Sequence, residues 1–242
     1  MKKILALAIV AMMAFACVFS ASAAEKTLPD LDCSGWWTAH SEGVEVTADG
    51  ITVTFNSITY ADAVNNWNGP LWVLYTSDDA TITYPGTYDA PNYVEYWAHR
   101  VDNYGWGFGV NRWSSADELA GVGVSIDAVD SRTDGWADFL ANMKAGISCT
   151  LTVKLEGSNA VATFDANGIY TTISLPVDTS KPVYLALTGE MATLTNIKVV
   201  TPDPVVDDGN ADNAPTGDLI ALPIALLCIS AGAVLTLKKK VG

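Results

Sequence analysis

Apolar and polar residues alternate with period two through much of the chain between residues 44 and 200. The segment Thr150-Leu151-Thr152-Val153-Lys154-Leu155 is the clearest example. This alternation is typical of a β-strand that buries one face and exposes the other. It predicts about ten short strands, at residues 44–46, 51–58, 71–75, 94–101, 105–110, 150–155, 160–164, 170–175, 183–187 and 194–200.

Turn-forming residues separate these predicted strands. Asp49-Gly50, Asn68-Gly69-Pro70, Pro85-Gly86 and Asn167-Gly168 are examples. Helical spacing occurs at residues 136–143. The sequence therefore predicts one all-β domain over residues 25–200, a β-sandwich of the jelly-roll or concanavalin A lectin-like type.

The N-terminus has the pattern of a secretory signal peptide, residues 1–24. Lys2 and Lys3 precede an apolar run over residues 4–19, and Ala21-Ser22-Ala23 is a small-residue cleavage site. We expect a signal peptidase to cut after Ala23 or Ala24. The protein is thus predicted to be secreted.

The C-terminus combines a short motif, an apolar segment and terminal cations. A Pro- and Asp-rich spacer, residues 201–216, leads into Asn213-Ala214-Pro215-Thr216-Gly217, which overlaps its end. Residues 219–237 are apolar, and the basic tail 238–242 follows. This order resembles the cell-wall sorting signal of Gram-positive surface proteins, whose common motif is Leu-Pro-x-Thr-Gly. The resemblance implies that a sortase cuts between Thr216 and Gly217 and joins Thr216 to peptidoglycan.

The apolar segment has the length of one membrane span. Nineteen residues form a helix of about 28 Å, close to the hydrocarbon thickness of a bilayer, and the terminal lysines stay on the cytoplasmic side. Transient insertion would hold Thr216 just outside the membrane. Asn213 and Ala214 stand where Leu and Pro are usual, so a retained C-terminal membrane anchor stays open as the alternative. Both interpretations predict a cell-surface location.

The charge of the chain narrows the ligand classes. Its formal net charge is −14, and removal of both terminal segments takes away five lysines and one aspartate. Such acidity argues against nucleic acid and anionic glycans as ligands, because their negative charges would be repelled. Neutral ligands remain.

The sequence leaves open whether two cysteines form a disulfide and whether paired carboxylates bind a structural Ca²⁺. Cys33 and Cys149 are the cysteines outside the terminal segments, and both one disulfide and two buried thiols are compatible with the sequence. No His or Cys lies at metal-ligand spacing from either of them. The pairs Asp78-Asp79 and Asp127 with Asp130 are compatible with a structural Ca²⁺, although no loop has EF-hand spacing.

Tryptophan distribution points to a possible binding surface. All eight tryptophans lie between Trp36 and Trp136. A flat apolar ring can cover the C–H face of a pyranose while polar groups bond its hydroxyls. Trp67 lies in the polar loop Asn65-Asn66-Trp67-Asn68-Gly69-Pro70, so we expect it to be exposed. Trp36 and Trp37 are adjacent, so on a strand they would point in opposite directions.

The strand at 94–101 carries further candidates. Strict alternation puts Glu95, Trp97 and His99 on one face, and Arg100 and Asp102 on the other. Arg100 and Asp102 are expected to form an ion pair if buried and to bond ligand hydroxyls if open. A compact polar and aromatic turn, Asp102-Asn103-Tyr104-Gly105-Trp106-Gly107, follows.

Three segments carry a family resemblance: Gly35-Trp36-Trp37-Thr38-Ala39-His40-Ser41, Asn66-Trp67-Asn68-Gly69-Pro70 and Arg100-Val101-Asp102-Asn103-Tyr104-Gly105-Trp106. They resemble the non-catalytic β-sandwich carbohydrate-binding modules of gut Firmicutes. The resemblance implies a binding cleft with Trp67, Arg100, Asp102, Tyr104 and Trp106 as its candidate residues. Local sequence adds Trp37, His40 and Trp97. The candidate ligand-binding residues are Trp37, His40, Trp67, Trp97, Arg100, Asp102, Tyr104 and Trp106.

The sequence therefore predicts a non-catalytic surface protein that binds a neutral plant polysaccharide, such as starch or a xylan. An adhesin for a host protein or glycoprotein is the first alternative, since protein interfaces are also rich in aromatic residues. A jelly-roll glycoside hydrolase with Glu95 and Glu190 as its carboxylate pair is the second. A serine triad is disfavoured because the chain has two histidines and no Gly-x-Ser-x-Gly motif.

Overall fold

A computed structural model describes residues 24–35, 38–78, 80, 82, 89–90, 92–128 and 136–202. Residues 1–23 of the predicted signal peptide, the sorting motif with Thr216 and Gly217, and the apolar segment 219–237 lie outside these residues, and so does Trp37. Within the described ranges, no helix is long and apolar enough to cross a membrane.

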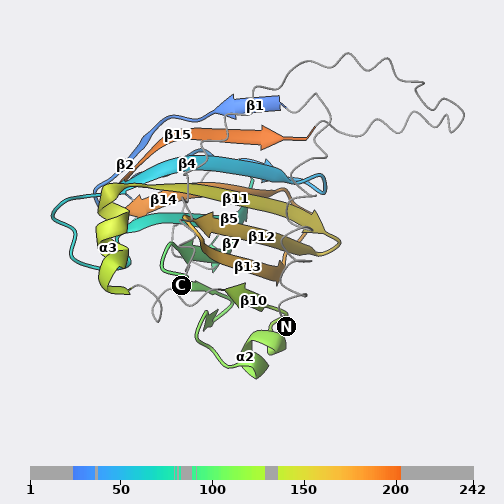
Figure 1. Ribbon diagram of the computed structural model, residues 1–242. Helices are drawn as coiled ribbons and strands as arrows, with labels where there is room; N and C mark the ends of the chain where they lie inside the picture. The colour runs from blue at the N-terminus through green and yellow to red at the C-terminus, as the bar shows by residue number, and fades with distance from the viewer. Residues whose placement is uncertain are drawn as a thin grey trace, which may run out of the picture. The chain divides into compact units, whose positions relative to one another are not determined.

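Two antiparallel sheets pack face to face as a β-sandwich (Figure 1). The eight-stranded sheet has the order β1-β15-β4-β11-β12-β13-β10, and β2 also pairs with β15. Its strands are β1 (Ala24–Thr27), β2 (Leu31–Cys33), β4 (Ile51–Thr59), β10 (Ser125–Ala128), β11 (Ile147–Glu156), β12 (Asn159–Ala166), β13 (Ile169–Pro176) and β15 (Ala192–Thr201).

The seven-stranded sheet has the order β3-β14-β5-β7-β8-β9, and β6 pairs with β7. Its strands are β3 (Val44–Val46), β5 (Gly69–Ser77), β6 (Asp89–Ala90), β7 (Tyr93–Arg100), β8 (Gly105–Gly107), β9 (Val110–Asn111) and β14 (Val183–Glu190). The all-β sandwich prediction is confirmed, and every predicted strand overlaps an observed one.

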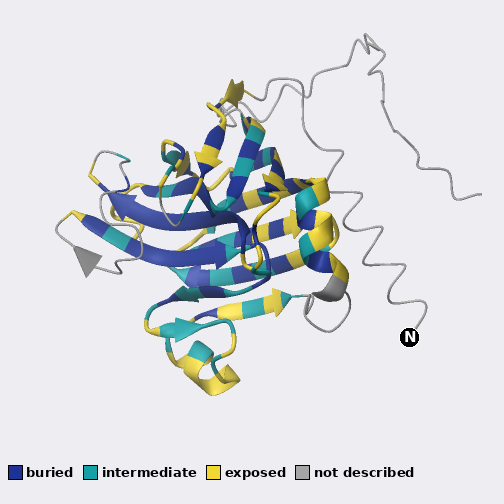
Figure 2. Cartoon of the chain, turned by 90° about the vertical axis from the view of Figure 1, so that its left-hand side faces the viewer, coloured by how far each residue is buried: buried dark blue, intermediate teal, exposed yellow. Residues whose placement is uncertain are grey.

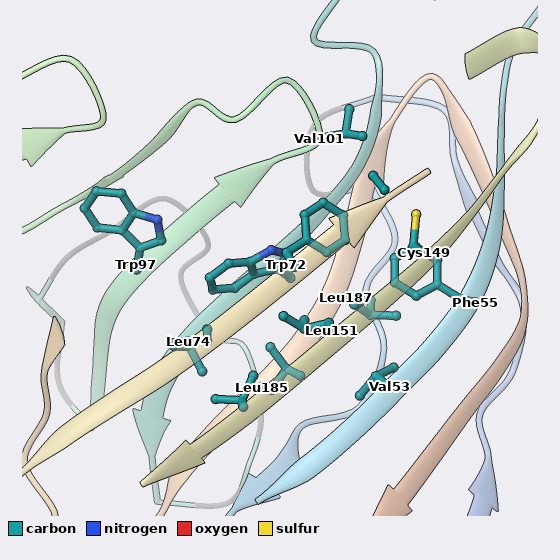
Figure 3. Packing of buried hydrophobic residues seen from close by; sticks show 14 of the residues in the cluster. Val53, Phe55, Trp72, Leu74, Trp97, Val101, Cys149, Leu151, Leu185 and Leu187 are labelled. Carbon is teal, nitrogen blue, oxygen red and sulfur yellow. The ribbon is translucent and has the colours of Figure 1, made fainter. Parts of the chain in front are cut away.

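The core lies between the sheets because each sheet turns its alternate apolar residues inward. In β4 the pattern is strict: Ile51, Val53 and Phe55 are buried while the residues between them are not. Trp72, Leu74, Leu185 and Leu187 of the seven-stranded sheet pack in the same cluster (Figure 3). The alternation that predicted the strands is thus the pattern of the core.

The seven-stranded sheet is buried on its other face too. All nine residues of β5 are buried, and Figure 2 shows strands that are dark blue along their whole length beside strands banded in several colours. A second apolar cluster covers this outer face, made of Val73, Tyr75, Ile82, Tyr93, Ala98 and Ala186 with the partly buried Trp106 and Tyr184. The central strands of the seven-stranded sheet are therefore buried on both faces, whereas β4 and β11 of the eight-stranded sheet bury one face.

Within the residues that the structure describes, two helices connect strands. α3 (Trp136–Ala145) confirms the predicted helical segment, and it packs near β4. α2 (Ala116–Gly121) was not predicted, although Ser115 and Glu118 form a capping box at its start. The strands that the sequence analysis missed are short or exposed: β1, β2, β6 and β10.

The predicted strand 105–110 is divided in two. Phe108 and Gly109 have φ values of 54° and 76° and connect β8 to β9 as a two-residue hairpin turn. Two consecutive residues with positive φ match the twist of antiparallel strands. This hairpin brings the residues after β9 back beside the start of β8.

A β-bulge changes the predicted faces of β7. Leu74 pairs with Trp97 while Tyr75 pairs with Glu95, so Tyr96 is an extra residue in β7. Trp97 and Tyr96 both pack in the core between the sheets, and Glu95 lies on the outer face with Tyr93. The prediction that Glu95 and Trp97 share a face is therefore wrong.

Cys33 and Cys149 are both buried free thiols. They belong to β2 and β11, which β15 and β4 separate in the same sheet. Three strand spacings are about 14 Å, more than twice the Cα–Cα distance that a disulfide bridges. Of the two alternatives, the structure shows the free thiols.

Candidate functional site

Arg100 and Asp102 form a bidentate ion pair. Arg100 Nε donates to Asp102 Oδ1 at 2.9 Å, and Nη2 donates to Oδ2 at 2.6 Å. The side chains are 16% and 5% exposed, so water screens the pair only weakly. Of the two alternatives left open by the sequence, the structure shows the ion pair expected for buried side chains, and its two parallel hydrogen bonds fix the guanidinium plane.

Two aromatic rings flank this guanidinium. Arg100 Cζ lies 5.6 Å from the centroid of the Trp67 ring and 4.6 Å from that of the Tyr104 ring. Both distances are within the range of cation–π attraction. Trp67 is 38% exposed, as its polar loop predicted. Arg100 therefore connects two rings that are far apart in the sequence.

The aromatic set continues beyond Tyr104. The Tyr104 and Trp106 ring centroids are 5.9 Å apart at 37°, and Tyr104 and Trp113 are 6.5 Å apart at 39°. Arg112 Cζ lies 4.8 Å from the Trp113 ring centroid. We call Trp67, Arg100, Tyr104, Trp106 and Trp113 the aromatic strip.

Trp113 and Arg112 were missed by the sequence analysis. Trp113 is 39% exposed, and it follows β9 in the turn Asn111-Arg112-Trp113-Ser114. Asn111 Oδ1 accepts from the Trp113 backbone N–H at 2.8 Å, an Asx-type turn. An aromatic residue between Asn and Ser at the end of a strand is the signal that could have identified it.

The turn between β7 and β8 is held from both sheets. The Arg100 backbone N–H donates to Tyr104 O at 2.7 Å, and Asn103 has a positive φ of 60°. Thr171 Oγ1, on β13 of the facing sheet, donates to Asn103 Oδ1 at 2.6 Å. The turn carrying Asp102 and Tyr104 is thereby fixed to the sandwich.

Trp97 belongs to the core, which corrects its prediction as a binding residue. It is 0% exposed, and its Nε1 donates to His99 Nδ1 at 3.3 Å. The His99 ring stacks on Trp72 at 5.0 Å. Burial lowers the pKa of His99 to about 3, so the ring is neutral and serves as a core residue.

His40 is exposed and lies apart from the ion pair. It forms a β-bridge with Thr188 of β14, and its Nδ1 lies 3.2 Å from Ser41 O. The predicted set is therefore divided: Trp67, Arg100, Asp102, Tyr104 and Trp106 come together, His40 lies further along the sheet, and Trp97 is in the core.

The predicted carboxylate pair is too far apart for glycoside hydrolysis. Glu95 is paired with Tyr75 and Glu190 with Gly69, six residues apart on β5. This separation is about 20 Å, against the 5–10 Å that either glycosidase mechanism uses. Glu95 instead accepts from Tyr93 OH at 3.0 Å, and burial together with this charge raises the pKa of Tyr93.

No cluster of three or more His, Cys, Asp or Glu suited to a metal occurs in the part of the chain that the structure covers. Asp79 and Asp130, which complete the two carboxylate pairs considered for Ca²⁺, lie outside it.

Comparisons with known proteins give low similarities. No protein-family model matches the chain, and no curated protein matches it. Among solved structures, it is similar to the exoplasmic/lumenal domain of VIP36 in its Ca²⁺-bound form, with a TM-score of 0.38 and 10% identity over 76% of this chain and 84% of that one. The Ca²⁺/Man2-bound form gives 0.37 and 12% over 78% and 85%.

A β-fructofuranosidase from Schwanniomyces occidentalis, complexed with fructosyl-erythritol, gives a TM-score of 0.35 and 6% identity over 75% of this chain and 33% of that one. At these values the similarity concerns the arrangement of a β-sandwich, and ligand and activity must be argued from the site itself.

Proposed function

We propose that this domain is a non-catalytic carbohydrate-binding module that holds polysaccharide on the aromatic strip. The observation that carries the proposal is the arrangement of Arg100, which is fixed by Asp102 and flanked by the rings of Trp67 and Tyr104.

This arrangement offers both kinds of contact that a sugar needs. Trp67 and Trp113 present ring surface at 38% and 39% exposure, suited to the C–H face of a pyranose. The partly exposed guanidinium of Arg100 has five N–H donors, and Asp102 occupies two of them. We propose that the remaining donors bond the hydroxyl groups of a sugar that lies on the rings.

Preorganisation favours binding at such an open surface. The ion pair and the Asn103 anchor hold Arg100 and Tyr104 in place before a ligand arrives. Less side-chain entropy is then lost on binding, and this loss is one of the costs that reduce affinity. We expect modest affinity for a short oligosaccharide and strong retention by many copies together.

A neutral plant glycan such as starch or a xylan is the proposed ligand, and its neutrality is argued from the net charge of −14. The proposed place of action is the cell surface. It rests on the signal-peptide pattern and on the sorting motif at Thr216 and Gly217, with peptidoglycan as the covalent partner.

Capture of a host protein is the second candidate. Trp, Tyr and Arg are also the residues enriched at the energetic centres of protein interfaces, and the strip consists of these three types. Catalysis is the least favoured, since the pair proposed for it is about 20 Å apart by strand register.

The test is a glycan-binding screen of residues 24–202, which contain all strands of both sheets, with reducing-sugar release measured in parallel. Binding of a neutral glycan without release supports the proposal. The double variant Trp67→Ala/Trp106→Ala should lose that binding while it stays folded. Tyr170→Ala is the matched control, because Tyr170 is also 38% exposed but lies on β13 of the other sheet.

Release of sugar would instead indicate an enzyme that uses other carboxylates. Absence of binding to every neutral glycan would favour the host-protein alternative.

A further inference from the structure

The antiparallel pairing of β4 with β15 defines two ends of the sandwich. Thr59, the last residue of β4, pairs with Ala192, the first residue of β15. At the other end, Thr52 of β4 pairs with Val200 of β15. Each strand therefore finishes where the other begins. At about 3.3 Å per residue, the ten residues of β15 separate these two ends by about 30 Å.

The aromatic strip lies at the end where β4 finishes. Thr59 Oγ1 donates to Asn68 O at 2.9 Å, and Asn68 directly follows Trp67 in the loop that joins β4 to β5. Arg100 is paired with Leu71, the third residue of β5. The ion pair and the Trp67 loop are thus at the same end of the domain.

The described chain leaves the domain at the opposite end. β15 finishes at Thr201, which is paired with Ala24, the first residue of β1. The arrowheads of β1 and β15 accordingly point in opposite directions in Figure 1. In the sequence, the predicted sorting motif follows Thr201. An anchor on that side and a ligand on the strip would act on opposite ends of the domain.

Tension between these two ends would load β4 and β15 in shear. The Trp67 loop continues from the end of β4, and the anchor would pull on the end of β15. The two strands would then be pulled in opposite directions along their own axes. Because the hydrogen bonds of an antiparallel ladder are perpendicular to the strands, the seven residue pairs of this ladder would share the load. Peeling from one end would instead break them one after another.

β15 is also held along its other edge and by the core. β1 and β2 pair with its two halves. Between these halves the Leu28 N–H donates to Ile197 O at 2.9 Å, and the Asn196 N–H donates to Asp30 Oδ1 at 3.0 Å. Leu194 and Ile197 are 0% exposed. Sliding of β15 would therefore disrupt two ladders and move buried apolar side chains out of their packing.

We propose that the domain has a mechanical function: it bears tension between a polysaccharide on the aromatic strip and an anchor that follows Thr201, with the β4–β15 ladder as the load-bearing element. This inference rests on the proposed carbohydrate binding at a cell surface and adds resistance to pulling. Such tension arises whenever a cell and the polysaccharide that it holds move apart.

The experiment is single-molecule force spectroscopy on residues 24–216, the mature chain that the sequence predicts, with one handle at the C-terminus. The second handle is attached to Val64→Cys, at a position that is 79% exposed in the loop after β4. The matched variant is Ala48→Cys, at an exposed position in the turn before β4. Cys33 and Cys149 are buried and do not compete for the handle.

Both variants load the same two strands in different directions. Val64→Cys pulls β4 and β15 past each other, whereas Ala48→Cys pulls the start of β4 away from the end of β15 and opens the ladder pair by pair. At equal loading rate, we expect the unfolding force to be at least about twofold higher for Val64→Cys. Urea denaturation of both variants should give equal unfolding free energies, so that direction alone accounts for the difference in force.

Equal unfolding forces in the two directions would overturn the inference. That result would leave the carbohydrate-binding proposal intact, because no glycan is present in the force measurement. Titration of the same two variants with the glycans of the screen tests the proposed ligand separately. Absence of binding would overturn the carbohydrate-binding proposal, while a higher force for Val64→Cys would still support the load-bearing ladder.

Discussion

Asp102 accepts two parallel hydrogen bonds from Arg100, at 2.9 Å and 2.6 Å, although one residue alone separates them in the chain. Val101, between them, is buried in the core and belongs to the turn that ends β7. The ion pair therefore both closes the turn and orients the guanidinium between Trp67 and Tyr104. The stability of the turn and the proposed binding therefore depend on the same contact.

Asp102→Asn should lower both the stability of the domain and its affinity for glycan. Removing one charge of a largely buried pair leaves the other uncompensated, and we expect a loss of about 2–4 kcal/mol in unfolding free energy. Glycan affinity should fall by at least tenfold. Urea denaturation and titration calorimetry measure the two effects.

Glu42→Gln provides the comparison, because Glu42 pairs with Lys26 at the surface with side chains 53% and 61% exposed. This substitution should lower the unfolding free energy by less than about 1 kcal/mol. Equal effects of the two substitutions would contradict the structural role assigned to Asp102.

Gly105→Ala should unfold or severely destabilise the domain. A Cβ at this position would collide with the indole nitrogen of Trp97 and with His99 Nδ1, both in the core. Overpacking of this kind costs about 1–3 kcal/mol or more. Thermal unfolding measures it.

Gly121→Ala is the matched substitution in open space, since nothing lies within 4 Å of its added Cβ. It should be neutral or slightly stabilising in α2. A Gly105→Ala protein as stable as the parent would show that Trp97 and His99 are not packed as described.

Stability should decrease as pH falls below about 6.5 because of His99. Its pKa is lowered from 6.5 to about 3 by burial. Between these values the unfolded chain binds a proton that the folded chain does not, so acid favours unfolding. The contribution of His99 should approach about 1.4 kcal/mol per pH unit.

Urea denaturation at several pH values from 7 to 4 tests this. His99→Phe should keep the ring stacking on Trp72 and show a smaller pH slope than the parent. A parent slope unchanged by His99→Phe would contradict the prediction.

Cys33 and Cys149 should resist thiol reagents in the folded protein. Burial raises the pKa of Cys33 to about 11 and that of Cys149 above its usual range. The reactive thiolate is then scarce at neutral pH. Ellman titration should detect both thiols only after unfolding in guanidinium, without a reductant.

Detection of a Cys33–Cys149 disulfide by mass spectrometry of the protein purified without reductant would contradict the strand order, which keeps these residues three strands apart.

Maltooligosaccharides should bind more tightly than cello-oligosaccharides of equal length. The Tyr104 ring is inclined at 37° to Trp106 and at 39° to Trp113. Rings set at angles suit a curved chain whose sugar faces rotate, and a flat ribbon would contact fewer of them. A competition assay with both oligosaccharide series measures their relative affinities. A preference for cello-oligosaccharides would show that fewer rings contact the sugar.

Local patterns were sufficient to predict most of the fold. Burial alternates along β4 and β11 as their sequences do, because a side chain in a strand points to one of two faces. The same logic failed at β7. One extra residue, Tyr96, reverses the faces before it, and the sequence of β7 contains no turn residue that signals a bulge.

The candidate site was predicted in part. Trp67 was expected to be exposed from its polar loop, and an ion pair of Arg100 with Asp102 was one of the two alternatives that their spacing allowed. Both expectations rest on neighbours in the chain. Trp113 was missed: the turn Asn111-Arg112-Trp113-Ser114 marks it as a turn residue, but the hairpin between β8 and β9 is what brings it to the strip.

The sequence by itself determined the all-β class, the positions of the longer strands and the polar loop of Trp67, because alternation and turn residues act over a few neighbouring positions. Tertiary structure alone decided that Trp97 is in the core, that Glu95 and Glu190 are far apart, and that Trp67 and Trp113 belong to one aromatic strip. Those outcomes depend on strand order and register. Hydrogen bonds between distant segments set both, and residue spacing along the chain does not record them.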